Sequence, residues 1–438
     1  MKHPSLPAEF ARYASLSVLG MAAVSCYILA DTFFVARGLG ATGLAALNLA
    51  IPVYNVIHGA GMLLGMGGAT RFAILRSQGA ARRADSVFTH TLAMAAAAAV
   101  VFAVLGGGFA APALAALLGA DGATAAMTAT YLRVLLLFSP AFLLNDVLVC
   151  FVRNDGAPQL AMAATVSGSL ANVVMDYIFI FPCGLGIFGA VLATGFSPVI
   201  GVLVQAPHWL GSRRGFHLAR VRPRLRTAGQ VLALGVPSFL DQFSGAVVMI
   251  TFNTLILGLA GNTGVAAYGV VANLSLVVLS VYTGIAQGAQ PLVSRAWGRR
   301  QRPQLRALLR YALAAAPAFS AVLYAVVFFG AGPIAAIFNS ESDPALQAIA
   351  VQGLRLYFLA APFAGANIIL AVYFASVEQA VPAQAVSLLR GLVVIVPLAV
   401  ALAAAFGMPG VWLAFPVCET LVAAVAFLLL RRMRKTLQ

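Results

Sequence analysis

YLRVLLLFSPAFLLN (Tyr131–Asn145) has a counterpart in GLRLYFLAAPFAGAN (Gly353–Asn367). An arginine, a proline and an asparagine recur at matching places in the two segments, always 222 residues apart. This separation is close to half of the 438-residue chain, and Arg76 with Arg299 repeats it to within one residue. The sequence therefore predicts two halves of similar structure.

The composition is typical of a polytopic membrane protein, because 62% of the residues are hydrophobic and only 9% are charged. Apolar runs of about 20 residues recur along the chain, and each is long enough to cross about 30 Å of hydrocarbon as a helix. We predict an all-α fold of twelve transmembrane helices in two six-helix lobes. The approximate limits of the spans are 14–36, 44–70, 86–115, 127–151, 158–181, 187–210, 229–257, 264–292, 310–338, 347–376, 382–405 and 409–430.

The spans and the basic segment between them predict an N-lobe at 1–210, a basic linker at 211–228 and a C-lobe at 229–438. Arginines concentrate in this linker and in the other loops on the same side, whereas the opposite loops carry Asp121 and Glu341. The positive-inside rule then places both termini in the cytoplasm, with the chain in a bacterial inner membrane. The net charge of +15 lies in short loops, so we expect no nucleic-acid partner.

The chain shows no sequence motif typical of an enzyme. GLGIFG (Gly184–Gly189) has the glycine spacing of a dinucleotide loop, but it follows a predicted helix rather than a strand. Patterns for zinc proteases, serine hydrolases and ATP-binding loops are missing from the sequence. We expect no enzymatic activity, no cofactor and no structural metal, so any active transport would use an ion gradient or a separate ATPase.

Four oxygen-bearing residues fall at one depth in the outer half of the N-lobe. Asp31 and Asp176 each lie about five residues from the outer end of their spans, estimated from the helix rise. Asn172 precedes Asp176 by one helical turn, and Thr194 follows early in the next span. Carboxylates inside a membrane are costly unless they face the protein interior or a water-filled cavity.

This layer has two interpretations from the residues alone. A hard cation such as sodium prefers oxygen ligands of this kind, so it could bind transiently at Asp31, Asn172, Asp176 and Thr194. A proton would suit the same site, because burial and a like-charged neighbour disfavour two ionised carboxylates. The alternative is a structural hydrogen-bond cluster.

The C-lobe carries a second group of charged residues within its spans, namely Asp241, Arg390 and Glu419. Arg390 and Glu419 are at compatible depths, so a buried ion pair between them is the simpler expectation and a direct transport role the alternative. In the N-lobe, we expect Asp146 to cap a helix or to pair with Arg153 or another basic loop residue. His58 is expected to be a hydrogen-bonded imidazole rather than a proton carrier.

Several segments resemble the multidrug and toxic compound extrusion (MATE) family, in the same order and over nearly the whole chain. The first span and turn, the fourth span, the fifth and sixth spans and three C-lobe segments carry the likeness: ILADTFFVARGLGATGLAALNLAIP, YLRVLLLFSPAFLLNDVLVCFVRNDGAPQLAM, SLANVVMDYIFIF, GIFGAVLATGFS, AQGAQPLVSRAWG, VSLLRGLVVIVPLAV and VWLAFPVCETLVA.

The resemblance implies two lobes around a central cavity and export of cationic or amphipathic drugs in exchange for sodium ions or protons. The family's N-lobe cation residues correspond to Asp31, Asn172, Asp176 and Thr194. Many members carry a proline early in span 1, where this chain has Leu16. We expect contacts with membrane lipids and function as a monomer.

Two other functions compete with drug antiport. A lipid or lipid-linked sugar flippase of the same broad superfamily would need many basic residues in its cavity to hold pyrophosphate. Only Arg133, Arg355 and Arg390 are candidates, so we rank the flippase lower. A non-transporting scaffold or receptor would leave the layered acidic and polar residues of the N-lobe unexplained.

Overall fold

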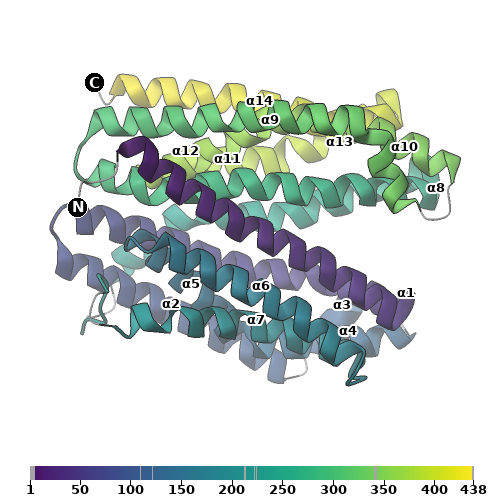
Figure 1. Ribbon diagram of the computed structural model, residues 1–438, viewed down its shortest axis with the longest axis horizontal. Coiled ribbons are helices and arrows are strands. Elements are labelled where there is room, and N and C mark those ends of the chain that lie inside the picture. Colours follow the sequence, from purple (N-terminus) through teal and green to yellow (C-terminus); the bar gives the residue numbers. More distant parts are fainter. Residues whose placement is uncertain are drawn as a thin grey trace.

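The computed structural model describes residues 5–108, 110–120, 122–211, 214–220, 222, 224–339 and 343–436. Asp121, Glu341 and residues 212, 213, 221 and 223 of the predicted linker lie outside the described residues. In the described ranges, every regular element is a helix (Figure 1): α1 (Leu6–Ser77), α2 (Ala81–Gly107), α3 (Ala110–Leu117), α4 (Gly122–Leu137), α5 (Ser139–Asn154), α6 (Pro158–Ile180), α7 (Gly186–Trp209), α8 (Leu225–Gly298), α9 (Arg302–Phe338), α10 (Pro344–Tyr357), η1 (Phe358–Ala360), α11 (Ala361–Ser376), α12 (Ala380–Leu388), η2 (Leu389–Val393), α13 (Ile395–Phe406) and α14 (Met408–Thr436).

The two longest helices each contain one sharp break. The backbone of α1 breaks at Gly40 (φ 66°, ψ −160°), and that of α8 breaks at Gly261 (φ 61°, ψ −156°). Only glycine adopts such angles readily. Each long helix therefore consists of two spans joined at one residue, and the breaks occupy matching places in the two halves.

The helices confirm the predicted all-α membrane fold. Within the described residues, ten helices are long and apolar enough to cross a membrane, and α4 with α5, bent by 50°, makes an eleventh. That count takes the whole of Leu225–Gly298 as one span. Dividing α8 at Gly261, as α1 is divided at Gly40, gives the twelve predicted spans.

Two apolar cores divide the molecule along the predicted repeat. One core lies among α1 to α7 and includes Phe72 and Phe151; the other lies mainly among α8 to α14 and includes Tyr282 and Trp412. Figure 1 shows the two groups of helices side by side, with both chain ends at the same end of the molecule, which we call the terminal face. The lobes therefore correspond to the two sequence halves.

Glycines allow the backbones of α1 and α8 to meet between the lobes. A Cβ on Gly235 would lie 1.8 Å from the carbonyl oxygen of Leu63, and one on Gly288 would lie 2.6 Å from the Cα of Ala14. Real side chains do not tolerate such distances, so these positions require glycine. Gly288 is one of the residues that recur between the halves, at the place of Gly65.

Polar side chains join the lobes near the terminal face. The Nη2 of Arg295 donates to Oε1 of Glu9 at 2.7 Å. Arg71 pairs with Glu378, whose other oxygen accepts from Nε1 of Trp297 at 3.2 Å. We call these five residues the terminal-face latch, because they tie the start and end of α1 to the C-lobe.

A second set of inter-lobe bonds lies beside the latch. The Nη1 of Arg153 donates to Oε1 of Gln287 at 2.8 Å. The amides of Asn154 and Gln290 bond reciprocally, at 2.8 and 3.1 Å, and Gln290 also donates to Oγ1 of Thr70 at 2.9 Å. The end of α5 is thereby fixed to the second half of α8.

The described part of the linker is bound to the N-lobe. Backbone N–H groups of Gly215, His217 and Ala219 donate to side chains of Asp155, Asp85 and Thr89 respectively. Phe216 between them is only 1% exposed and packs against the rings of Phe72, Phe88 and Phe151. The linker therefore seals the terminal end of the N-lobe core.

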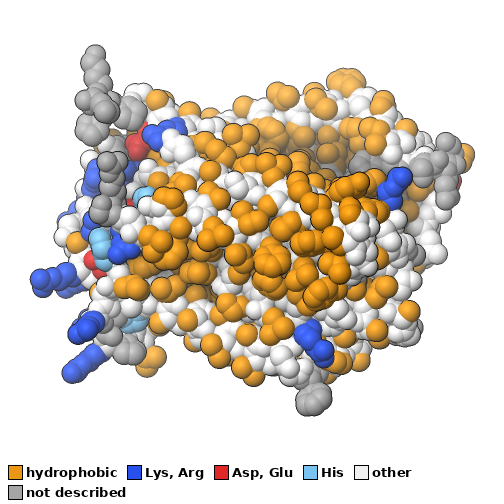
Figure 2. Space-filling model, turned by 60° about the horizontal axis from the view of Figure 1, so that its bottom comes forward, with side chains coloured by type: hydrophobic (Ala, Val, Ile, Leu, Met, Phe, Trp, Pro, Cys, Tyr) orange, Lys and Arg blue, Asp and Glu red, His pale blue; other side chains and the backbone are white. Residues whose placement is uncertain are grey.

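The surface agrees with a membrane-spanning protein. Figure 2 shows Lys and Arg side chains gathered mainly at the left-hand end, which is the terminal face of Figure 1, while hydrophobic side chains cover most of the middle. Many large apolar residues of the protein are well exposed, among them Val104 at 68% and Phe329 at 83%. An apolar surface of this extent suits contact with lipid acyl chains.

Candidate cation and substrate sites

Asp31 on α1 and Asp176 on α6 face each other inside the N-lobe. They are 7% and 0% exposed, and their carboxyl groups lie within hydrogen-bonding reach of each other. The Oδ1 atom of each is buried and makes no hydrogen bond. Two ionised carboxylates offer only acceptors, so a proton or a cation between them would relieve their repulsion.

Asn172 and Thr194 complete the layer predicted from helix depth. With its amide oriented to satisfy both ends, Asn172 donates to Oδ2 of Asp176 at 3.1 Å and accepts from the backbone N–H of Thr194 at 3.1 Å. The hydroxyl of Thr194 donates to the carbonyl of Ala190 at 3.1 Å, which leaves its oxygen able to accept a hydrogen bond or ligate a cation. The structure thus brings the four predicted residues together.

Tyr131 also belongs to this site, although it was not among the residues predicted from the sequence. It lies on α4, is 4% exposed, and its hydroxyl is within hydrogen-bonding reach of Thr194 and close to Asp31 and Asp176. A comparison of the two sequence halves could have singled out Tyr131. Tyr131 aligns with Gly353 in the second half, so the phenol is not needed to build the shared fold.

The three charged residues of the C-lobe form one cluster. Arg390 donates to Oε1 of Glu419 from Nη2 at 2.8 Å and from Nε at 3.1 Å. Asn367 donates to the other oxygen, Oε2, at 2.6 Å. The Nη1 of Arg390 reaches Asp241 at 3.5 Å. The expected ion pair is therefore present, and Arg390 extends from the π-helical turn η2.

Asp241 and Glu419 have different surroundings. The Glu419 side chain is 1% exposed and both its oxygens are bonded, whereas that of Asp241 is 34% exposed. Asp241 lines a small cavity between the lobes, whose other walls are Met66, Thr70, Leu234, Pro237, Ser238, Gln290, Ala371, Val372 and Ala375. The cluster thus combines one satisfied ion pair with a second carboxylate that faces the lobe interface.

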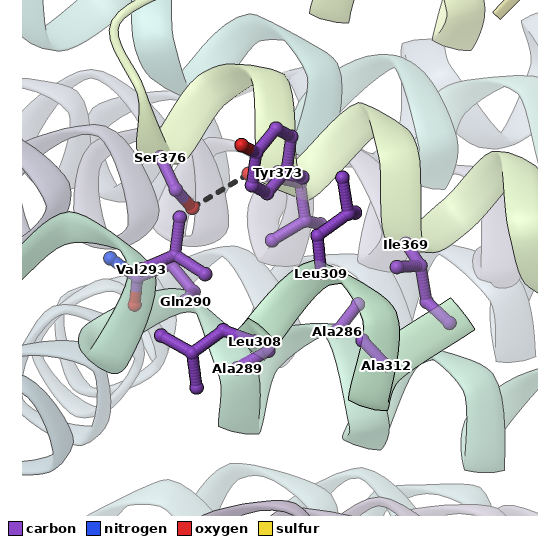
Figure 3. Close-up of a pocket in the computed structure, with 11 residues that line it drawn as sticks. Ala286, Ala289, Gln290, Val293, Leu308, Leu309, Ala312, Ile369, Tyr373 and Ser376 are labelled. Atoms are coloured by element: carbon purple, nitrogen blue, oxygen red, sulfur yellow. Dashed lines mark hydrogen bonds between the residues drawn. The ribbon is translucent and has the colours of Figure 1, made fainter. Parts of the chain in front are cut away.

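Another cavity lies wholly within the C-lobe. Figure 3 shows its walls, which come from α8, α9 and α11 and consist mainly of small aliphatic side chains. The hydroxyl of Ser376 is turned to its own helix, where it donates to the carbonyl of Val372 at 2.7 Å (Figure 3). No acidic residue is among its lining residues, so this cavity does not resemble a cation site.

Asp146 differs from the sequence-based expectation. Arg153 is directed to Gln287, and the residue beside Asp146 is His58, whose Nδ1 lies 2.9 Å from Oδ2 of the carboxylate. The expected pairing of Asp146 with Arg153 was therefore wrong. Both residues lie on one helix, α5, but depth along a helix does not reveal which neighbouring helix supplies a partner.

Within the described residues, no three His, Cys, Asp or Glu side chains gather as they would around a bound metal. The N-lobe site instead combines two carboxylates, an amide and hydroxyl groups. Such a mixed oxygen set suits a hard monovalent cation or a proton rather than a tightly held transition metal.

The comparisons with known proteins agree with this architecture. The MatE family profile matches residues 17–178 and 237–401. The multidrug export protein MepA of Staphylococcus saprophyticus is 26% identical over 397 residues, covering 90% of this chain and 86% of that protein. MepA of Staphylococcus aureus strain MRSA252 is 24% identical and covers 100% of this chain and 94% of that protein.

Solved structures show the same fold. An outward-facing multidrug resistance transporter of the MATE family matches with a TM-score of 0.90 and 25% identity, over 98% of this chain and 96% of that one. A MOP superfamily transporter from Pyrococcus furiosus matches with a TM-score of 0.89 and 26% identity, at the same coverage. Because the family profile spans most of both halves, this chain belongs to the MatE family of multi-pass membrane transporters.

Proposed function

We propose that this protein exports cationic or amphipathic drugs from a bacterial cell in exchange for sodium ions or protons. The observation that carries the proposal is the pair Asp31 and Asp176, two buried carboxylates with unpartnered oxygens inside a transmembrane lobe. Acidic residues in such places are usually functional. The names of the relatives, multidrug export proteins, support the substrate class.

The N-lobe site supplies the coupling step. A cation that binds at Asp31 and Asp176 neutralises charge inside the lobe, while Asn172 and Thr194 offer further oxygens. Its binding shifts the balance between outward-open and inward-open states only if its affinity differs between them. The Asp31 and Asp176 carboxylates lie on different helices, α1 and α6, so loss of the cation favours their separation.

The orientation follows from charge. The arginine-rich terminal face is placed in the cytoplasm of the inner membrane by the positive-inside rule. The terminal-face latch then closes the cytoplasmic side, so the structure corresponds to an outward-facing state. The similarity to an outward-facing MATE transporter supports this assignment.

Asp241 is the proposed recognition point for the positive charge of a drug. Because Glu419 is paired with Arg390, Asp241 contributes the excess negative charge of the C-lobe cluster. It faces the lobe interface beside Met66, a flexible side chain that adapts to ligands of different shape. A cationic amphiphile fits this combination of one carboxylate and apolar walls.

The test is transport by purified protein in liposomes, with ethidium as the fluorescent cation and either a pH or a sodium gradient imposed. We expect one of these gradients to drive ethidium movement and Asp31→Asn to reduce it to background. Asp85→Asn, which changes a carboxylate that bonds the linker, is the matched control and should retain transport. Undiminished gradient-driven transport by Asp31→Asn would overturn the proposal.

A further inference from the structure

His58 and Asp146 form a partly buried pair that the proposed coupling site does not include. His58 Nδ1 lies 2.9 Å from Asp146 Oδ2, and the side chains are 23% and 10% exposed. The Asp146 carboxylate packs against α1 at Gly61, where any larger residue would clash, because a Cβ there would lie 2.3 Å from Oδ2 of Asp146. An imidazole held against a carboxylate inside a membrane lobe is a titratable group in an unusual place.

Two tyrosines lie between this pair and the coupling site. The Tyr54 ring stacks on His58 with centroids 6.0 Å apart and planes inclined by 9°. Its hydroxyl is 2.7 Å from that of Tyr27, which precedes Asp31 by one turn on the same helix. Tyr54 therefore contacts His58 on one side and Tyr27 on the other.

The internal repeat shows that the fold does not require these polar residues. Asp146 aligns with Ile368 at the offset that pairs Asn145 with Asn367. His58 aligns with Val281 at the offset that pairs Gly65 with Gly288. The same spans therefore pack in the C-lobe with apolar side chains at both places, which indicates a role specific to the N-lobe.

The groups around His58 leave Asp146 as its direct charge partner. Tyr54 covers one face of the imidazole from α1 itself. One turn beyond Asp146 on α5, Cys150 packs against Gly65. From α8, Phe239 and Gln242 lie against Gly59, next to His58 in the chain, and neither side chain titrates. On α5, Arg153 is occupied by Gln287.

We propose that His58 and Asp146 form a second proton-binding site of the transport cycle. This inference deepens the proposed function and rests on it. The imidazole takes up one proton on its free ring nitrogen, Asp146 stabilises the imidazolium, and release of the same proton restores the neutral ring. Nitrogen is a poor ligand for sodium, so the site is selective for protons whichever cation binds at Asp31.

The two sites influence each other through charge. When His58 loses its proton, the pair carries the negative charge of Asp146 alone. That charge favours a cation at Asp31, and by reciprocity a cation at Asp31 favours release of the proton from His58. Cation entry from outside would thus drive proton release from His58.

The experiment compares wild type with His58→Gln in two measurements. The first is the pH profile of ethidium transport in liposomes at a fixed driving force; the second is the number of protons that purified protein takes up in weak buffer as the pH is lowered from about 8 to 5. We expect His58→Gln to lose one ionisation step in this pH range and to take up fewer protons per molecule. His208→Gln is the matched control, because His208 lies 2.9 Å from Asp155 outside this path, and it should behave as wild type.

A second variant separates titration from folding. Asp146→Asn keeps the imidazole but removes its charge partner, so it should displace the midpoint of the step that His58→Gln removes. A purely structural role would lower thermal stability without altering either readout. If His58→Gln keeps the wild-type profile and proton count, the second site is refuted, while transport by Asp31→Asn separately decides the proposed function.

Discussion

Similar carboxylates in this protein have different partners. Glu419 accepts hydrogen bonds from Arg390 and Asn367 on both of its oxygens, as expected for a structural ion pair. Asp31 and Asp176 each retain an oxygen without a partner. A buried acceptor left unpaired is destabilising, and this cost supports the proposed uptake of a cation by the N-lobe pair.

The C-lobe ion pair gives a stability prediction. Arg390→Met leaves Glu419 buried and without its cation, so we expect the free energy of unfolding to fall by about 3–5 kcal/mol. The double variant Arg390→Met with Glu419→Leu should recover much of that loss, because the fully buried charge is gone and the remaining carboxylate, Asp241, is 34% exposed. Thermal unfolding in detergent measures both. A single variant as stable as wild type would show that water or Asn367 already satisfies Glu419.

Depth along predicted helices was enough to group Asp31, Asn172, Asp176 and Thr194. It was not enough to find Tyr131 or the true neighbour of Asp146. Depth is a one-dimensional coordinate that follows from helix rise, whereas partners depend on which helices are adjacent and how each is rotated. Comparing the two halves, as at Tyr131 and Gly353, supplies part of that missing information.

At the scale of helices, the breaks at Gly40 and Gly261 join pairs of spans with one residue each. Their φ and ψ angles agree to within a few degrees, and a Cβ at either position would meet nothing within 4 Å. The requirement for glycine is therefore a matter of backbone conformation alone.

Gly261→Ala tests this requirement. We expect the free energy of unfolding to fall by about 1–3 kcal/mol, because alanine is strained at φ 61°. The matched control is Gly258→Ala in the same helix, where a Cβ also meets nothing and the backbone is helical. It should be neutral or stabilising by up to about 1 kcal/mol. Equal effects of the two substitutions, measured by thermal unfolding, would contradict the conformational explanation.

Hydrophobic length predicted where the spans lie, but not their irregular turns. The 50° bend between α4 and α5 lies beside Pro140, in the first turn of α5. The π-helical turn Leu389–Val393 has no comparable marker in the sequence. It arises from a local change in hydrogen-bond register, and such turns are frequent at functional sites. Here it positions Arg390 toward Glu419 and Asp241.

For the molecule as a whole, the internal repeat predicted two lobes but not which side would be closed. Both halves have similar helices, and outward-open and inward-open states of transporters differ by only a few kcal/mol. Closure at the terminal face depends on residues that are not repeated. Arg71 aligns with Ser294, and Glu378 aligns with Gly156. The equivalent positions of the repeat therefore cannot form a second ion pair.

Weakening the terminal-face latch should open that side. Arg71→Gln removes the charge partner of Glu378, so we expect faster hydrogen–deuterium exchange in the last two turns of α1 and the end of α8. Arg310→Gln, whose guanidinium lies over the Tyr311 ring of the same helix, is the matched control and should leave exchange unchanged. Unaltered exchange in Arg71→Gln would mean that the Arg153 and Asn154 bonds close this side without the latch.

The bound linker limits how far the lobes can part. Its residues from Gly215 to Ala219 are fixed to the N-lobe, and the backbone N–H of Arg224 donates to Nε2 of His90 at 3.0 Å, one residue before α8 begins. If only that last bond breaks, the chain from Ala219 to Leu225 can extend to about 20 Å. Under the proposed export cycle, this length would set the widest opening at the terminal face, and hence the largest drug that could enter past the linker.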